Sequence, residues 1–247
     1  MLLRLFSDIH LDFDAETKPK RNQQPLTDFL WFPESLSTDK DTVLVLAGDL
    51  WFDNRPFERR NDPKAWIELV AERFKAVVIV LGNHDYWDSS LQRAPQKAKE
   101  SIASLSLLNV YLLERDALVL DDVKLVGATL WTDLGKSDPI LMFNVPKMIK
   151  DYDFITYGIG NARRRLRVYD IQKAHQDSLS WIKTNAVRDY PGQKLIVLTH
   201  MAPSFRSIPD YKKTYEYSGY NPLYYSDLDY TVMELCPDYW MHGHIHN

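Results

Sequence analysis

The sequence predicts an α/β domain, in which β-strands alternate with α-helices along the chain. Two observations support this: short runs rich in valine, leucine and isoleucine recur, and stretches with helical spacing lie between them. Several runs are apolar at consecutive positions, as expected of strands that are buried on both faces. Alternation of this kind is typical of sheets covered by helices. The predicted strands cover residues 2–6, 43–47, 77–81, 110–113, 123–130 and 195–199.

Three stretches have the apolar periodicity of amphipathic helices. In the first, Trp66, Val70 and Phe74 are spaced by four residues, which places them on one face of a helix. Asp62-Pro63 precedes this stretch and is a typical helix start. The predicted helices cover residues 64–74, 93–106 and 166–187.

Two stretches read as irregular. Residues 12–41 are polar and interrupted by proline, which predicts a surface loop with one helical turn around 27–31. Residues 210–230 hold seven of the fourteen tyrosines. A packed loop is the simpler interpretation of that segment, and a lid that stacks a base or another flat group is the alternative.

Composition limits the function classes. The 247 residues suffice for one domain, and the net charge of -4 argues against broad, non-specific nucleic-acid binding while leaving a nucleotide site open. Cys236 is the sole cysteine, which excludes an internal disulfide and a thiolate metal site. Asp8 interrupts the first apolar run, and the longest such run, residues 76–81, is too short to span a bilayer. We therefore expect a cytoplasmic protein that does not associate with membranes.

Five short polar motifs each follow an apolar run. In α/β sheets, ligands bind beyond the carboxyl ends of the strands, so this common position brings residues 8 to 246 into one site. Their two carboxylates, one amide and four imidazoles are a full ligand set for two divalent ions, with donors that suit Mn, Fe, Zn or Mg. The motifs read Ser7-Asp8-Ile9-His10, Gly48-Asp49, Gly82-Asn83-His84-Asp85, Thr199-His200 and His242-Gly243-His244-Ile245-His246.

In this order the motifs resemble the D-x-H, G-D, G-N-H-[DE], H and G-H-x-H series of calcineurin-type metallophosphoesterases. Residues 127–133 and 199–204 further resemble a bacterial and phage-type branch whose substrates are mostly unassigned. The resemblance implies a four-layer α-β-β-α sandwich of two mixed sheets flanked by helices, with a dimetal site at the strand carboxyl ends. We expect one domain over residues 1–247. Family members usually continue into further closing strands, which are either absent here or lie outside a sequence that stops at Asn247.

The resemblance also implies two divalent metal ions, with Mn favoured. They would lie about 3.5–4 Å apart and activate a bridging hydroxide for in-line attack on phosphorus. The implied ligands are Asp8, His10 and His246 for one metal, Asn83, His200 and His244 for the other, and Asp49 as the bridge.

In the same way, the resemblance assigns catalysis to His84, which would contact the phosphate and protonate the leaving oxygen, with Asp85 as its orienting partner. The implied function is hydrolysis of a small phosphate mono- or diester. A phosphodiesterase or nuclease acting on nucleotides is the alternative within this class, and a non-catalytic metal-binding scaffold is the alternative outside it. The residues after Gly48-Asp49 depart from the G-D-x-x-D-R-G of protein serine/threonine phosphatases, which disfavours that activity. The sequence indicates no particular protein partner.

Three further features favour structural roles. His175 lies on the apolar stripe of its predicted helix, which is typical of a half-buried structural histidine. His242 precedes a glycine turn, and we do not predict that it binds metal. The arginines at 163, 164, 165 and 167 are interpreted as a solvated helix start, with a patch that guides phosphate as the alternative.

Overall fold

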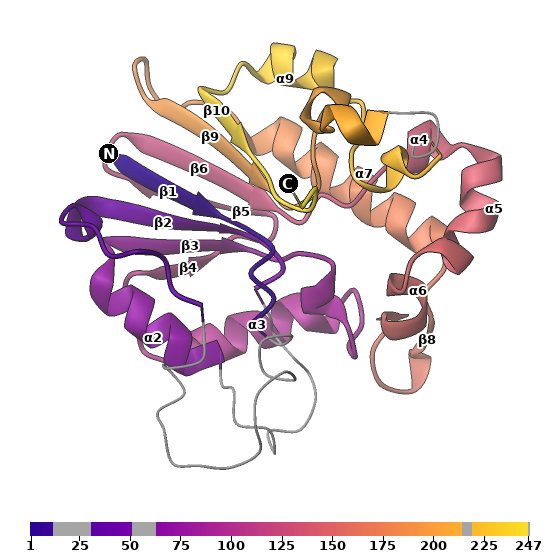
Figure 1. The fold of residues 1–247 in the computed structure, drawn as a ribbon, viewed down its shortest axis with the longest axis horizontal. Coiled ribbons are helices and arrows are strands. Elements are labelled where there is room, and N and C mark those ends of the chain that lie inside the picture. Colours follow the sequence, from indigo (N-terminus) through magenta and orange to yellow (C-terminus); the bar gives the residue numbers. More distant parts are fainter. Residues whose placement is uncertain (12–30, 51–62, 214–218, 247) are drawn as a thin grey trace.

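Two four-stranded sheets form the centre of the protein (Figure 1). The computed structural model describes residues 1–11, 31–50, 63–213 and 219–246, so the turn expected around 27–31 lies outside these residues except for Trp31. The first sheet is parallel in the order β1-β2-β3-β4, and the second is mixed in the order β10-β9-β6-β5, with β5 antiparallel to β6. The strands are β1 (Leu2–Phe6), β2 (Thr42–Ala47), β3 (Ala76–Val80), β4 (Val110–Leu112), β5 (Asp116–Leu120), β6 (Val123–Ala128), β9 (Lys194–Thr199) and β10 (Tyr239–Met241).

Strand β2 shows why the apolar runs are continuous. All six of its residues are buried. Leu44 and Leu46 pack in the cluster that includes the helices, whereas Val43 and Val45 pack in the cluster between the two sheets. Successive side chains of a strand point to opposite faces, so a central strand between two apolar layers needs apolar residues throughout.

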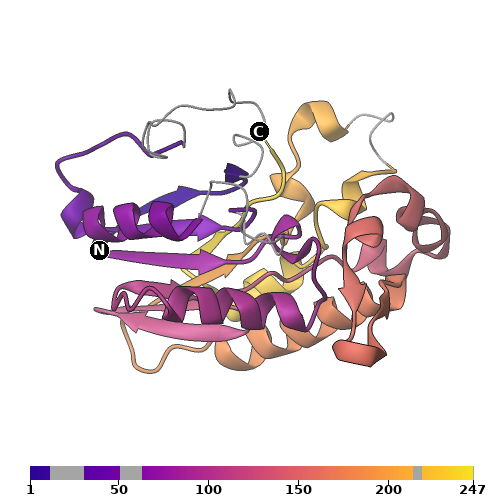
Figure 2. The ribbon, with the colours of Figure 1, turned by 90° about the horizontal axis from the view of Figure 1, so that it is seen from below.

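Helices cover the outer faces of both sheets. α2 (Pro63–Arg73) and α3 (Arg93–Ala103) lie against the first sheet and run side by side (Figures 1 and 2). α7 (Val168–Asn185) packs against β6 of the second sheet. The predicted four-layer sandwich is therefore confirmed. The six predicted strands and three predicted helices agree with the structure to within three residues at each end.

A helical insertion between β6 and α7 was not predicted. It contains α4 (Leu134–Ser137), α5 (Pro139–Met148), α6 (Asp151–Phe154) and the short pair β7 (Thr156–Tyr157) and β8 (Arg164–Arg165). Asp138 caps α5, because its Oδ1 accepts hydrogen bonds from the backbone of Ile140 and Leu141, both at 2.8 Å. An N-cap aspartate followed by proline is a start signal that identifies such a helix. In the last part of the chain, α9 (Asp229–Leu235) precedes β10.

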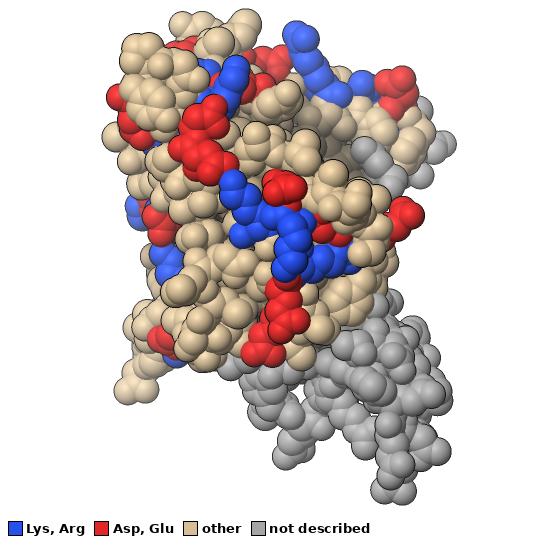
Figure 3. All heavy atoms as spheres, turned by 90° about the vertical axis from the view of Figure 1, so that its left-hand side faces the viewer, with Lys and Arg blue, Asp and Glu red and all other residues tan. Residues whose placement is uncertain are grey.

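The face at the amino ends of the strands carries interleaved basic and acidic side chains (Figure 3). The ion pairs at strand starts and adjacent turns include Lys75 with Asp121 at 2.6 Å and Lys124 with Asp189 at 2.6 Å. Charges paired in this way are typical of a solvated face rather than of a binding site. Among the described residues, no helix is long and apolar enough to cross a membrane.

Candidate metal centre

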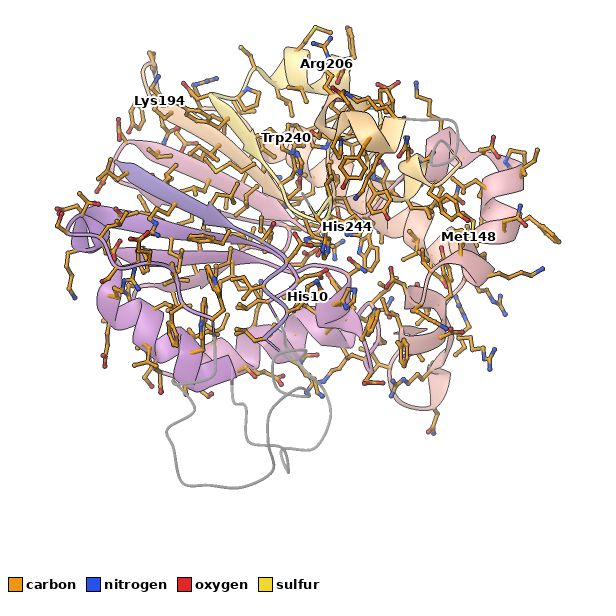
Figure 4. The ribbon with its side chains drawn as sticks, in the orientation of Figure 1. His10, Met148, Lys194, Arg206, Trp240 and His244 are labelled. Carbon is orange, nitrogen blue, oxygen red and sulfur yellow. The ribbon has the colours of Figure 1, made fainter. Side chains whose placement is uncertain are left out.

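The five sequence motifs meet at the carboxyl ends of β1, β2, β3, β9 and β10. Figure 4 shows His10 and His244 close together at this edge, whereas Lys194 marks the opposite end of β9. Two overlapping groups of side chains each bring their ligand atoms within 4.8 Å of one another. The first group is Asp8, His10, Asp49 and His246, and the second is Asp8, Asp49, His200 and His244.

Asp49, like Asp8, belongs to both groups. Its Oδ1 accepts a hydrogen bond from the backbone of His84 at 2.9 Å, which fixes the carboxylate. Its Oδ2 lies 3.4 Å from His200 Nε2 and 3.8 Å from His10 Nε2. This oxygen is buried and has no hydrogen-bond partner in the described part of the chain. Burial alone would raise the pKa of Asp49, but the charge and polar contact of His200, together with the charge of His84, outweigh it and hold the pKa well below its ordinary value. An ionised, partly unsatisfied carboxylate is suited to bridge two cations.

His200 is fully buried and has a fixed ring orientation. Its Nδ1 lies 2.7 Å from the Ala47 carbonyl oxygen, to which it donates a hydrogen bond. Nε2 therefore faces Asp49 and lies 3.1 Å from Asn83 Oδ1. A second ring nitrogen bound to a carbonyl is the usual arrangement of metal-binding histidines. Burial opposes protonation, yet Asp49 and Asp8 raise the pKa of His200 to about 9. The surrounding carboxylates thus favour a positive charge at this position.

Asn83 is oriented by a residue that sequence reasoning did not identify. Asp151, in α6, accepts two hydrogen bonds from Asn83 Nδ2, at 3.0 and 3.2 Å. The indole of Trp87 donates to Asp151 Oδ1 at 2.8 Å. The amide nitrogen of Asn83 is thereby directed away from His200, and its oxygen is directed towards the ligand group. Asp151 lies outside the five motifs, so no sequence signal marks it.

The last motif contributes His244 and His246 beside Asp8. The His244 backbone nitrogen donates to Asp8 Oδ2 at 2.9 Å, and His246 Nε2 lies 3.1 Å from Asp8 Oδ1. His244 Nδ1 is buried and has no hydrogen-bond partner among the residues that the structure describes. Burial and the charge of His200 lower the pKa of His244 to about 3, so its ring is neutral and can act as a ligand.

Several candidate ligands have a backbone conformation that is strained for a residue with a side chain. A non-glycine residue with positive φ is uncommon, and such conformations cluster at functional sites. The candidate ligands with positive φ are Asp8 (55°), His10 (47°), Asp49 (52°), His244 (68°) and His246 (51°). Gly48 has a φ of +90°, and a Cβ at this position would lie 2.3 Å from His200 Nδ1.

His84 lies at the edge of the ligand group and is partly exposed. Its ring stacks on Trp87 at 3.9 Å and meets His10 edge-on at 4.6 Å. Burial lowers the pKa of His84 to about 4, and the neighbouring His10 and His200 contribute to this against the effect of Asp49. Its ring is therefore neutral in the resting protein.

Asp85 connects two of the motifs. Its Oδ2 accepts hydrogen bonds from the backbone of Gly82 at 2.8 Å and of Asp49 at 3.0 Å. These bonds hold the turns after β2 and β3 together. The expected role of Asp85 as the orienting partner of His84 stays a prediction.

The two remaining histidines have hydrogen-bond partners outside the ligand groups. His175 is buried, and its Nδ1 lies 3.2 Å from the carbonyl oxygens of Leu130 and Trp131. His242 lies 2.8 Å from Ser207 Oγ through Nε2. Neither histidine belongs to the two ligand groups found among the described residues.

A cavity of about 550 Å³ opens beside the ligand group. The tyrosine-rich segment contributes Tyr220 and Tyr224 to its wall, while residues 214–218 of that segment lie outside the described residues. None of the four clustered arginines lines the cavity. Arg164 instead pairs with Asp170 at 2.7 Å, as the structural interpretation of this patch expects.

Comparisons with known proteins agree with this geometry. The sequence profile of a family described as calcineurin-like phosphoesterase matches residues 1–247. An uncharacterised protein of Acanthamoeba polyphaga mimivirus is 25% identical over 254 residues, which cover 99% of this chain and 84% of that protein. The crystal structure of the phosphopantetheinyl hydrolase PptH from Mycobacterium tuberculosis is similar with a TM-score of 0.63 and 15% identity, covering 99% of this chain and 83% of that one. At this identity the structural similarity concerns the fold.

Proposed function

The chain belongs to the calcineurin-like phosphoesterase family, and from this premise we propose that it hydrolyses a small phosphate mono- or diester with two divalent metal ions. The observation that carries the proposal is that Asp49 belongs to two groups of ligand side chains and that its Oδ2 lies near both His200 and His10. Its Oδ2, buried and without a hydrogen-bond partner in the described part of the chain, is suited to a cation.

The donor set fits two hard or borderline ions such as Mn, Fe, Zn or Mg, and we favour Mn. When bound, such a pair supplies a water-derived nucleophile at neutral pH and neutralises charge on the phosphate oxygens. The chain provides the oriented ligands: His200 through its bond to Ala47, and Asn83 through Asp151. We assign Asp8, His10 and His246 to one ion, Asn83, His200 and His244 to the other, and Asp49 to both.

We propose that His84 donates the proton that the leaving group takes up. Its ring lies beside Asp49 and His10 but is not needed to complete either ligand group. Its position at the edge of the cavity allows it to reach an oxygen of a bound ester. The negative charge of a bound phosphate ester raises the pKa of His84 from its resting value and favours the protonated acid, whereas the charge of two bound cations would oppose it.

Activity on nucleotide diesters is the second candidate, because aromatic side chains such as Tyr220 and Tyr224 line the cavity and can stack on a base. Paired mono- and diester substrates distinguish the two activities.

The test of the proposed function is metal-dependent hydrolysis. The protein is stripped with a chelator, dialysed, and titrated with Mn, Fe, Zn or Mg while p-nitrophenyl phosphate and bis-p-nitrophenyl phosphate are assayed. We expect two metal ions per chain and activity that depends on them. Asp49→Asn should abolish metal binding and activity, whereas the control Asp177→Asn, on the exposed face of α7, should retain metal binding and activity. Full metal loading without hydrolysis of either ester would instead indicate a metal-binding scaffold.

A further inference from the structure

The lining of the cavity beside the metal centre is of two chemical kinds. Candidate ligands and His84 form the ligand end, together with Asp151 of α6 and Leu223, which contact Asn83 and His244, whereas apolar side chains of α4, α5 and α7 form another part. Its volume of about 550 Å³ lies within the range of roughly 300–1,000 Å³ that small-molecule sites occupy. A phosphoryl group at the ligand end fills only part of this space, so the remainder is available to the group that leaves.

The apolar part of the lining is rigid. It includes Leu134 and Ile171, whose exposed fractions are 1% and 4%, so the protein core fixes their positions. Met148 and Ile149, where α5 ends, form another part of the wall. Figure 4 places Met148 on the helical side of the site, apart from His244 on the strand side. Such walls gain free energy from an apolar ligand and disfavour a charged one.

Positive charge is scarce around this cavity. Lys150 is the only lysine or arginine among the described residues that line it. Its side chain is 73% exposed and lies 3.5 Å from Asp153. Polynucleotides and polyphosphates require several cations along their path. The lining therefore selects a ligand with little negative charge beyond the phosphate that reacts.

Aromatic side chains also line the cavity. Trp87 lies between His84 and Phe154, with ring separations of 3.9 and 4.7 Å and interplanar angles of 23° and 22°, so both of its faces are covered. Tyr224 lies 5.3 Å from the ring of His244. Tyr220, which also lines the cavity, is 49% exposed, and its ring is a flat surface that favours a flat ligand over a branched one.

Tyr152 adds a polar group to the wall outside the ligand set. Tyr152 lines the cavity, and its buried hydroxyl has no hydrogen-bond partner among the residues that the structure describes. Burial raises the pKa of Tyr152, and Asp151 adds to this effect, so the hydroxyl keeps its proton and can donate it. A ligand acceptor at this point would satisfy the donor.

We propose that this cavity binds the leaving group of the substrate, and that this group is a flat, largely apolar ring system of bicyclic size with an acceptor for Tyr152. The proposal rests on the phosphoesterase function proposed above. It names the class of ester that is cleaved: aryl or heteroaryl phosphates rather than polynucleotides.

The first experiment compares 2-naphthyl phosphate with phenyl phosphate, as monoesters and as methyl diesters, in the metal-loaded protein. We expect kcat/KM for the naphthyl ester to exceed that for the phenyl ester by at least about tenfold, because apolar pockets discriminate by that order per added group. Ile149→Ser should reduce this ratio towards one. The control Ile140→Ser should keep it, since Ile140 is 73% exposed and does not line the cavity. A ratio near one in the wild type, or faster cleavage of oligothymidylate, overturns the proposal.

Tyr152→Phe tests the acceptor with little risk to folding, because it removes only a hydroxyl without a partner among the described residues. The probe is 4-methylumbelliferyl phosphate, whose bicyclic ring carries a carbonyl, compared with 2-naphthyl phosphate. We expect the variant to lower the ratio of their kcat/KM values several-fold. An unchanged ratio contradicts the assignment of Tyr152.

Calorimetric titration of the protein with 2-naphthol and with phenol separates this proposal from the proposed function. If the protein binds 2-naphthol preferentially but hydrolyses no ester, the leaving-group pocket is supported and the proposed phosphoesterase function is rejected. If it hydrolyses both esters but binds both alcohols equally, the phosphoesterase function is supported and the leaving-group pocket is rejected.

Discussion

Asp151 holds the amide of Asn83 by two hydrogen bonds of 3.0 and 3.2 Å, across 68 residues of sequence. The same carboxylate accepts the indole proton of Trp87, whose ring stacks on His84. One buried acid in the α6 insertion thus positions both a candidate metal ligand and the proposed general acid. Residues that orient ligands in this way commonly change metal affinity by about 10–100-fold when they are replaced.

The first prediction concerns Asp151→Asn. An asparagine offers one acceptor oxygen where the carboxylate offers two, so Asn83 and Trp87 compete for it and the Asn83 amide loses its fixed orientation. We expect the affinity for one of the two metal ions to fall about 10–100-fold, measured by the Mn concentration that restores activity to the stripped protein. Asp153→Asn, two residues along α6 and exposed, is the matched control and should leave that concentration unchanged. Equal Mn requirements in both variants would show that Asp151 does not position Asn83.

The second prediction uses two glycines with nearly the same φ angle. Gly48 and Gly192 have φ values of +90° and +91°, but an added Cβ meets His200 Nδ1 at 2.3 Å in the first and nothing within 4 Å in the second. Gly192→Ala should cost only the backbone strain, about 1–2 kcal/mol of unfolding free energy. Gly48→Ala should cost more, and it alone should displace His200 and reduce Mn binding. Urea unfolding and metal titration of both variants check this, and equal effects would exclude the clash.

The strands and the ligand motifs were predictable because each has a local signal. Strand β2 is apolar on both faces, and Asp49 follows it after a single glycine. Strand β5 was missed although residues 117–120 are apolar at consecutive positions. It lies at the edge of its sheet, where Asp116 and Val119 are exposed, so its apolar run does not mark a strand buried on both faces.

Asp151 was missed for a different reason. It lies between Lys150 and Tyr152 in a polar tetrapeptide, Lys150-Asp151-Tyr152-Asp153, which is typical of an exposed helix start. Its burial follows from the packing of α6 against the turn that contains Asn83. Such a contact joins residues that are distant in sequence, and no periodicity encodes it.

The third prediction is a pH dependence of stability at Asp238, which joins β10 to β9. Its carboxylate accepts the backbone N–H of Leu195 at 2.8 Å and pairs with Lys194 at 2.9 Å and Arg188 at 2.8 Å. These contacts hold the pKa of Asp238 well below its ordinary value of 3.8. A lowered folded-state pKa contributes stability that is present above the unfolded-state value and is lost as the pH falls.

Asp238→Asn should therefore be less stable than the wild type at pH 6, with the difference shrinking below about pH 4. Urea unfolding between pH 3 and pH 7 measures this difference. The exposed Asp210→Asn serves as the reference for a charge change without the strand contacts. A difference that persists unchanged at pH 3 would show that the ionised carboxylate does not hold β10.

The fourth prediction concerns His84→Asn and separates proton transfer from metal binding. Asparagine keeps a polar side chain at the cavity edge but supplies no acidic proton, so the loss should depend on the leaving group. An alkyl or phenyl ester releases a basic oxygen that needs protonation, and we expect its kcat to fall by about 10²–10⁴-fold. A p-nitrophenyl ester releases a stable anion and should be affected much less. Two metal ions per chain should remain bound, because neither ligand group requires His84. Equal losses for both esters, or loss of metal, would assign His84 to binding rather than to proton transfer.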